Sequence, residues 1–136
     1  MYIMKASKGE ERIIEILQRG NYRFEREKRF EDLKGGQLRF DFYVDCAPAP
    51  KTVVEFQGEQ HYYPIPKFHK TRTDFESARE RDRRKISYCL SHNIPIYCIP
   101  DWELDNIESA SDIFQPKFRA IDRWKNDKDW SKFKSL

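Results

Sequence analysis

Two carboxylates stand in neighbouring predicted β-strands, at positions where strands normally carry apolar or β-branched residues. Asp41 lies in the middle of QLRFDFYV, residues 37–44, and Glu55 follows two valines in VVEFQGEQHY, residues 53–62. Paired strands lie about 4.8 Å apart, so carboxylates on adjacent strands can share one divalent cation. Without that cation their mutual repulsion would be severe. The spacing therefore indicates a metal site, with a solvated sheet face and its basic neighbours as the alternative.

Two predicted helices also aim a carboxylate inward. Glu10 falls in the middle of the apolar arc of the first helix, and Asp82 lies at the centre of the apolar stripe of the second. The flanking apolar residues are Ile13, Ile14 and Leu17 on the first helix, and Phe75, Ala78, Ile86 and Cys89 on the second. A buried carboxylate needs a cation, a donor or a metal-bound water. The structural alternatives are a helix cap for Glu10 and an ordinary ion pair for Asp82.

Periodicity and punctuation predict the elements that position these residues. Ser7-Lys8-Gly9-Glu10 is typical of a capping box, and the helix that it starts should end near Gly20. A second helix is expected over 74–91, and the predicted strands are 22–30, 37–44, 52–57 and 94–100. The second and third strands should form a hairpin. The predicted fold is α/β, with a mixed sheet of about four strands flanked by helices in the order α-β-β-β-α-β.

The clearest strand, residues 37–44, alternates between apolar and polar residues. Its two sides are predicted to be Leu38, Phe40, Phe42 and Val44 on one, and Arg39, Asp41 and Tyr43 on the other. After Pro100, residues 101–114 should be helical. Residues 101–136 as a whole form a predicted helical extension that is basic and aromatic towards its end.

Length and composition fit one domain spanning residues 1–136, with a core over 7–100. The net charge is only +3, although 36% of the residues are charged. The cysteines, Cys46, Cys89 and Cys98, have no CxxC or zinc-finger spacing, which is typical of a reduced compartment. There is no long apolar run and no leader-like N-terminus, so we expect no membrane partner and a cytoplasmic location, in the host cytoplasm or nucleoid.

The order of these motifs resembles the PD-(D/E)XK nuclease superfamily. Asp41 is followed on the next strand by Glu55-Phe56-Gln57, after a helix that begins with the Ser7–Glu10 motif. The stretch EFQGEQHY, followed by ERDRRKISYCLSHNIPIYCI, is similar to the short single-domain branch that includes very short patch repair endonucleases and some intron-encoded homing endonucleases. The further residues that match this branch are His61-Tyr62, Asp82 and Lys85. The resemblance covers about residues 7–100 and implies a restriction-endonuclease-like core.

The resemblance also implies an activity and a set of site residues. The expected activity is Mg²⁺-dependent endonucleolytic hydrolysis of DNA by a protein of a phage or mobile element, and Mn²⁺ could substitute for Mg²⁺. Asp41, Glu55 and the Phe56 carbonyl would bind the metal, and Glu10 would hold a metal-bound water, with Asp82 in support. Gln57 stands where the family signature has Lys, and Lys85 is the candidate to replace that lysine.

A basic segment after the third strand predicts the surface that binds DNA. The candidate residues are His61, Lys67, His69, Lys70, Arg72, Arg79 and Arg83. One site cuts one strand, so clean double-strand cleavage would need a homodimer or two successive nicks. Two alternatives remain. One is a nuclease with the same site that prefers Holliday junctions or flaps. The other is a DNA-binding module whose site has decayed, and Gln57 is the residue that keeps this alternative open.

Overall fold

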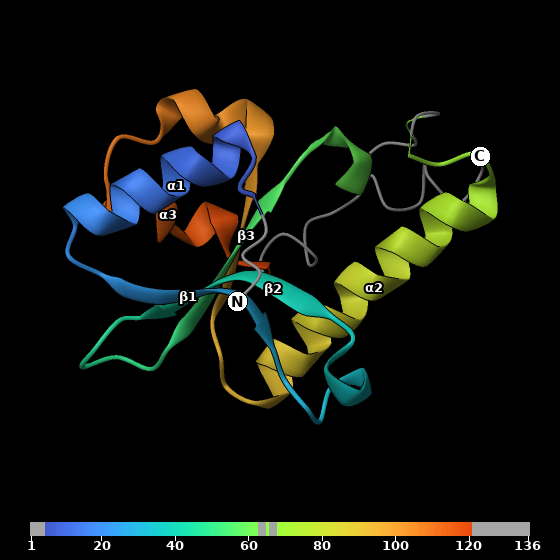
Figure 1. Ribbon diagram of the computed structural model, residues 1–136, viewed down its shortest axis with the longest axis horizontal. Coiled ribbons are helices and arrows are strands. Elements are labelled where there is room, and N and C mark those ends of the chain that lie inside the picture. Colours follow the sequence, from blue (N-terminus) through green and yellow to red (C-terminus); the bar gives the residue numbers. More distant parts are fainter. Residues whose placement is uncertain (1–4, 63–64, 66–67, 121–136) are drawn as a thin grey trace.

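A four-stranded mixed sheet forms the centre of the computed structural model, which describes residues 5–62, 65 and 68–120 (Figure 1). The helices and strands follow in the order α1 (Lys8–Arg19), β1 (Arg23–Arg29), β2 (Arg39–Asp45), β3 (Thr52–Gln57), α2 (Arg72–Ser91), β4 (Ile96–Pro100) and α3 (Ala110–Ile113). Short 3-10 turns lie at Lys34–Gly36, Glu59–His61, Asp101–Asn106 and Pro116–Phe118. The predicted order α-β-β-β-α-β and the mixed sheet are confirmed.

The strands lie side by side in chain order, β1-β2-β3-β4. β2 is antiparallel to both β1 and β3, so the predicted hairpin of the second and third strands is confirmed. β4 runs parallel to β3, and Glu55 lies opposite Cys98 in that pair. Parallel neighbours need a long crossover connection. Here α2 supplies it, which brings this helix against the strand that carries Glu55.

Two apolar cores lie on opposite faces of the sheet. The neighbouring residues Val53 and Val54 of β3 belong to different cores, as expected of consecutive strand residues that point to opposite faces. Val54 packs with Ile13 and Leu17 of α1, whereas Val53 packs with Ile86 of α2. In Figure 1, α1 and α3 lie together on one side of the sheet and α2 lies on the other. The site is built where β2 and β3 pass between these helices.

The predicted one-sided alternation of β2 is wrong at one position. Phe42 and Val44 pack in the core against α1, as the pattern predicted, but Phe40 packs in the opposite core against α2. The register explains the difference, because the β1–β2 partners include Arg26↔Phe42 and Lys28↔Phe40 but skip the residues between them. The alternation of side chains therefore changes face at Asp41.

The two long helices, α1 and α2, begin at capping boxes. The amide of Glu10 donates to Ser7 Oγ and the amide of Ser7 donates to Glu10 Oε1, each over 3.2 Å, which confirms the predicted start of α1. Thr71 and Asp74 make the equivalent pair at α2, so this helix begins two residues before the predicted position 74. The caps fix where each helix starts and hence which of its residues face the sheet.

The segment after β4 is less helical than its composition predicted. Residues 101–106 form a 3-10 turn, and α3 is a single turn over Ala110–Ile113. Between them Ile107 is extended and buried in the core against α1, so a continuous helix over 101–114 is interrupted there. The predicted tail beyond residue 120 lies outside the described residues.

Two further expectations concern the chain as a whole. Cys46, Cys89 and Cys98 are free thiols. Among the described residues, no helix combines the length and the apolar character that crossing a membrane requires.

Candidate active site

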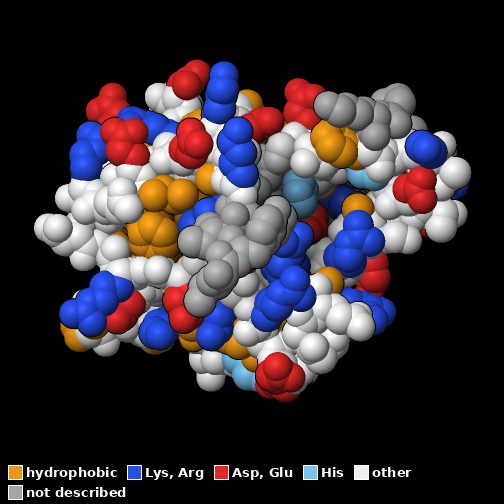
Figure 2. Space-filling model, viewed as in Figure 1, with side chains coloured by type: hydrophobic (Ala, Val, Ile, Leu, Met, Phe, Trp, Pro, Cys, Tyr) orange, Lys and Arg blue, Asp and Glu red, His pale blue; other side chains and the backbone are white. Residues whose placement is uncertain are grey.

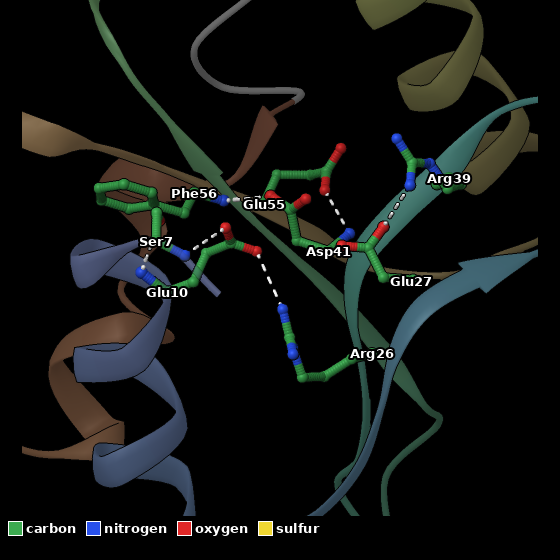
Figure 3. Close-up of polar contacts among 8 residues, drawn as sticks. All are labelled: Ser7, Glu10, Arg26, Glu27, Arg39, Asp41, Glu55 and Phe56. Carbon is green, nitrogen blue, oxygen red and sulfur yellow. Dashed lines mark hydrogen bonds and ion pairs between the residues drawn. The ribbon is translucent and has the colours of Figure 1, made fainter. Parts of the chain in front are cut away.

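Asp41 and Glu55 complete the sheet with their side chains at the point where backbone pairing between β2 and β3 stops. The β2–β3 register ends at Phe42↔Val54. Beyond it, the amide of Asp41 donates to Glu55 Oε2 over 2.7 Å, and the amide of Phe56 donates to Asp41 Oδ2 over 2.8 Å (Figure 3). Each carboxylate thus accepts a hydrogen bond from the backbone of the neighbouring strand, which holds the two acids side by side.

A kink in β1 brings a third acid to this place. Glu27 has a φ of 55°, in the left-handed region that non-glycine residues rarely adopt. It lies across from Asp41 at the skipped position of the β1–β2 register. Oxygen atoms of Glu27, Asp41 and Glu10 lie within 4.8 Å of one another, and Figure 3 shows the three carboxylates pointing toward a common region. Sequence reasoning missed Glu27.

Glu10 reaches the same region from the start of α1. Its neighbour Gly9 lets the helix lie against β3, because a Cβ at this position would overlap with ring atoms of Phe56. One carboxylate oxygen of Glu10 caps the helix, and the other lies 3.6 Å from Arg26 Nη2, where both side chains are 18% exposed. The predicted inward direction of Glu10 is confirmed, and it combines the capping role with a place beside Asp41.

Lys85 of α2 forms an ion pair with the second oxygen of Glu55, Oε1. The side chains of Lys85 and Glu55 are only 14% and 5% exposed, and the Lys85 ammonium lies 5.0 Å from the centre of the Phe40 ring. Burial lowers the pKa of Lys85, but the charges of Glu55 and Asp41 raise it by more, so its pKa lies above the ordinary value. The lysine is therefore a fixed positive charge next to the carboxylates.

The pKa of Asp41 is also raised, but for a carboxylate this disfavours the charged form. Burial raises its pKa well above the ordinary value, and the charge of Glu55 raises the pKa further. Lys85 and the amide of Phe56 lower it by less. The net effect disfavours the charged form of Asp41 in the protein alone. A cation bound to this carboxylate would reverse that effect.

Gln57 and Phe56 occupy the rest of the predicted signature. Gln57 is 3% exposed, and its Oε1 accepts a hydrogen bond from the Tyr62 hydroxyl over 2.7 Å. The positive charge beside Glu55 comes instead from Lys85 of α2. The Phe56 ring packs toward the core against α1, while its amide binds Asp41.

His61 and Asp82, which the resemblance named as separate site residues, contact each other beside α2. His61 Nδ1 lies 2.9 Å from Asp82 Oδ2, and the charge of Asp82 contributes to the raised pKa of Lys85. Arg79, predicted to bind DNA from the surface, is instead only 4% exposed. Its guanidinium donates to the His61 carbonyl over 2.8 Å. This is a correction: Arg79 holds the turn that carries His61, because it lies on the buried side of α2.

The other predicted DNA-binding cations divide by their surroundings. Arg72 and Arg83 are exposed and pair with Glu76 and Glu80 along α2. Lys70 is exposed just before that helix, and His69 is half-buried against Phe75. Lys67 lies outside the described residues. In Figure 2, Lys and Arg side chains gather on the face that α2 crosses, beside histidine side chains.

Comparisons with known proteins give viral relatives. Uncharacterized protein 307L of Invertebrate iridescent virus 6 is 37% identical over 67 residues, which cover 48% of this chain and 34% of the viral protein. Uncharacterized protein 094L of Frog virus 3 is 34% identical over 83 residues, which cover 54% of this chain and 52% of the viral protein. The matches thus span about half or less of the length of these curated relatives. No family model and no solved structure matches the chain.

Proposed function

We propose that the protein is a metal-dependent endonuclease that hydrolyses phosphodiester bonds in DNA, built on a restriction-endonuclease-like core. One observation carries the proposal. Carboxylates from α1, β1 and β2 converge within 4.8 Å, next to Asp41's partner Glu55, which forms an ion pair with the buried Lys85. Acids and a lysine around a single point are what metal-assisted attack on a phosphodiester requires.

The donor set suits Mg²⁺, and Mn²⁺ could take its place. The three acids that converge here all offer carboxylate oxygens, and a hard cation prefers oxygen ligands. Asp41 comes from β2, Glu27 comes from the kink in β1, and Glu10 comes from the start of α1. The raised pKa of Asp41 supports this fit, since a divalent cation would offset the repulsion between Asp41 and Glu55. Bound metal would supply an activated water and offset the negative charge that builds up on the oxygens around the phosphorus.

The residues of the chain have separate tasks in this proposal. Asp41 and Glu27 hold the cation, and Glu10 orients water on the α1 side. The Glu55 carboxylate accepts a hydrogen bond from the Asp41 amide, which keeps Asp41 in place, and it also pairs with Lys85. The ammonium of Lys85 supplies the positive charge for which Gln57 has no equivalent, because an amide only donates and accepts hydrogen bonds. Exposed cations on α2 and before it, such as Lys70, hold the substrate through its phosphates.

The test is incubation of purified protein with plasmid, linear and four-way-junction DNA in Mg²⁺, Mn²⁺ or EDTA. We expect cleavage with either metal and none in EDTA. Asp41→Ala and Glu55→Ala should both remove activity, and Glu25→Gln, an exposed acid two residues from Glu27, is the matched control. Preference for the junction would identify a structure-selective nuclease. Metal-dependent cleavage that survives Asp41→Ala would refute the site.

A DNA-binding module without catalysis is the second candidate. The observation that favours it is the buried amide of Gln57, held by the Tyr62 hydroxyl where the family signature has a lysine. Binding of DNA without cleavage of any substrate, in either metal, would select this candidate.

A further inference from the structure

A cleft of about 500 Å³ opens beside His61, between the turn after β3 and the N-terminal half of α2. Its walls include Gln60, His61, Phe68, His69, Lys70 and Arg81, and we call it the α2 cleft. Sites for small ligands commonly have volumes of about 300–1,000 Å³. The cleft therefore has the size for a small organic group, and its lining includes no strand residue and none of the carboxylates of the candidate active site.

The walls combine aromatic rings with positive charge. Phe68 is 54% exposed, the largest exposed fraction among the large apolar side chains of the described residues. The His69 ring lies beside it, with 6.5 Å between the ring centres, and packs edge-on against Phe75 at 5.1 Å. The amide of Ile65 donates to His69 Nδ1 over 3.0 Å, which fixes the orientation of that ring.

The charges of the cleft favour an anionic ligand. Lys70 and Arg81 are both exposed cations of its wall. The acid in the wall is Asp74, whose carboxylate already accepts hydrogen bonds from the amides of Lys70 and Thr71 as part of the α2 cap. Exposed rings together with cations that can contact phosphates are the features by which proteins bind unpaired nucleotides.

The cleft and the candidate active site both involve residues of α2. Arg81 lines the cleft, Asp82 binds His61, and Lys85 binds Glu55. Arg81 and Lys85 are four residues apart, a rise of about 6 Å along a helix. A strand of B-DNA rises about 3.4 Å per nucleotide. A base held beside Arg81 would thus lie within one or two nucleotides of a phosphate beside Lys85, the residue that pairs with Glu55.

We infer that the α2 cleft binds an unstacked base of the substrate strand, next to the phosphodiester that is cut. The inference rests on the proposed function and sharpens it: the substrate is DNA that carries an unpaired nucleotide near the cleavage point, as a bulge, a flap or a junction does. Phe68 stacks on the base, and Lys70 and Arg81 contact the flanking phosphates. Fully paired DNA would have to give up stacking and pairing to fill the cleft.

The test measures binding in EDTA, so that it does not depend on cleavage. The probe is a duplex with a single unpaired 2-aminopurine, and the matched probe carries the same base paired with thymine. We expect tighter binding of the unpaired probe, with quenched fluorescence. Phe68→Ala should weaken this binding by ~5- to 150-fold, the range that stacking of one base on one ring supplies. It should change binding of the paired probe far less.

Leu90→Ala is the control variant. Leu90 is an exposed apolar residue like Phe68, but it lies on α2 and does not line the cleft. It should bind both probes like the original protein. Equal affinity of the original protein for both probes, or unchanged binding and quenching in Phe68→Ala, would overturn the inference. Cleavage of plasmid in Mg²⁺ would then still support the nuclease. Conversely, a preference that Phe68→Ala removes, in a protein that cuts nothing, would keep the cleft and reject the nuclease.

Discussion

Asp41 and Glu55 each accept a backbone hydrogen bond from the strand that carries the other, at 2.8 and 2.7 Å respectively, where the β2–β3 ladder has ended. Two carboxylates thus accept the amide hydrogen bonds that backbone carbonyls would accept in a regular ladder, which places acidic groups inside the sheet. Lys85 of α2 pairs with one of them, Glu55.

The free energy of unfolding without metal should decrease as the pH rises. Because folding raises the pKa of Asp41, the folded chain binds more protons than the unfolded chain between the two pKa values. The decrease therefore begins near the ordinary Asp pKa of about 3.9 and continues up to the raised value. Asp41→Asn should remove this contribution, and denaturant unfolding in EDTA across this pH range measures it. The same pH dependence in both proteins would contradict the account.

Lys85→Ala should abolish cleavage and preserve DNA binding. The substitution removes the buried positive charge that accompanies Glu55, and with it the cation proposed to replace the signature lysine. Arg84→Ala is the control, since Arg84 directly precedes Lys85 in α2 but is exposed and pairs with Glu80. Cleavage rates and gel-shift affinities of the two variants provide the comparison. Full activity in Lys85→Ala would show that the lysine has no catalytic role.

Glu27→Gln should weaken metal binding by at least ~10-fold, because even groups that only support metal ligands commonly contribute that much. Titration with Mn²⁺, followed by electron paramagnetic resonance of the free ion, measures the change. The control is Glu25→Gln, since Glu25 lies on the same strand, is 60% exposed and pairs with Lys28. If both variants bound Mn²⁺ alike, Glu27 would not be a ligand.

Gly9→Ala should destabilise the protein by about 1–3 kcal/mol, the usual effect of an extra methyl in a packed site. The methyl would overlap with the Phe56 ring and push the start of α1, with Glu10, away from β3. Phe56→Leu should relieve part of this effect in the double variant, so the two changes should be non-additive. Strict additivity of the unfolding free energies would mean that the two residues do not press on each other.

The sequence predicts most of the scaffold because its signals are local. Pro48 and Pro50 separate β2 from β3, and the capping residues mark where α1 and α2 begin. Lys85 is indicated by the family resemblance, which places a basic residue three positions after Asp82, on the same face of the helix. These signals need no knowledge of which segments meet in space.

The parts that sequence reasoning missed depend on pairing between segments. Glu27 adopts a left-handed backbone without the Gly or Asn that would signal it. Phe24 in β1 and Phe30 directly after it are an even number of residues apart and yet pack in opposite cores, because the kink lies between them. Arg79 did carry a signal, since it lies one turn after the buried Phe75 on the same side of α2, but its charge suggested the surface.

We propose that Asp41 and Glu27, on neighbouring strands, bind the metal on which DNA cleavage depends. Plasmid nicking by Asp41→Asn tests this most directly. The substitution keeps the size of the side chain and removes its charge. The account predicts that the original protein nicks supercoiled plasmid in Mg²⁺ and not in EDTA. It also predicts that Asp41→Asn is slower by at least ~100-fold, an effect as large as that of the strongest supporting groups of metal sites. Nicking at the original rate by Asp41→Asn, with the same Mg²⁺ dependence, would contradict it.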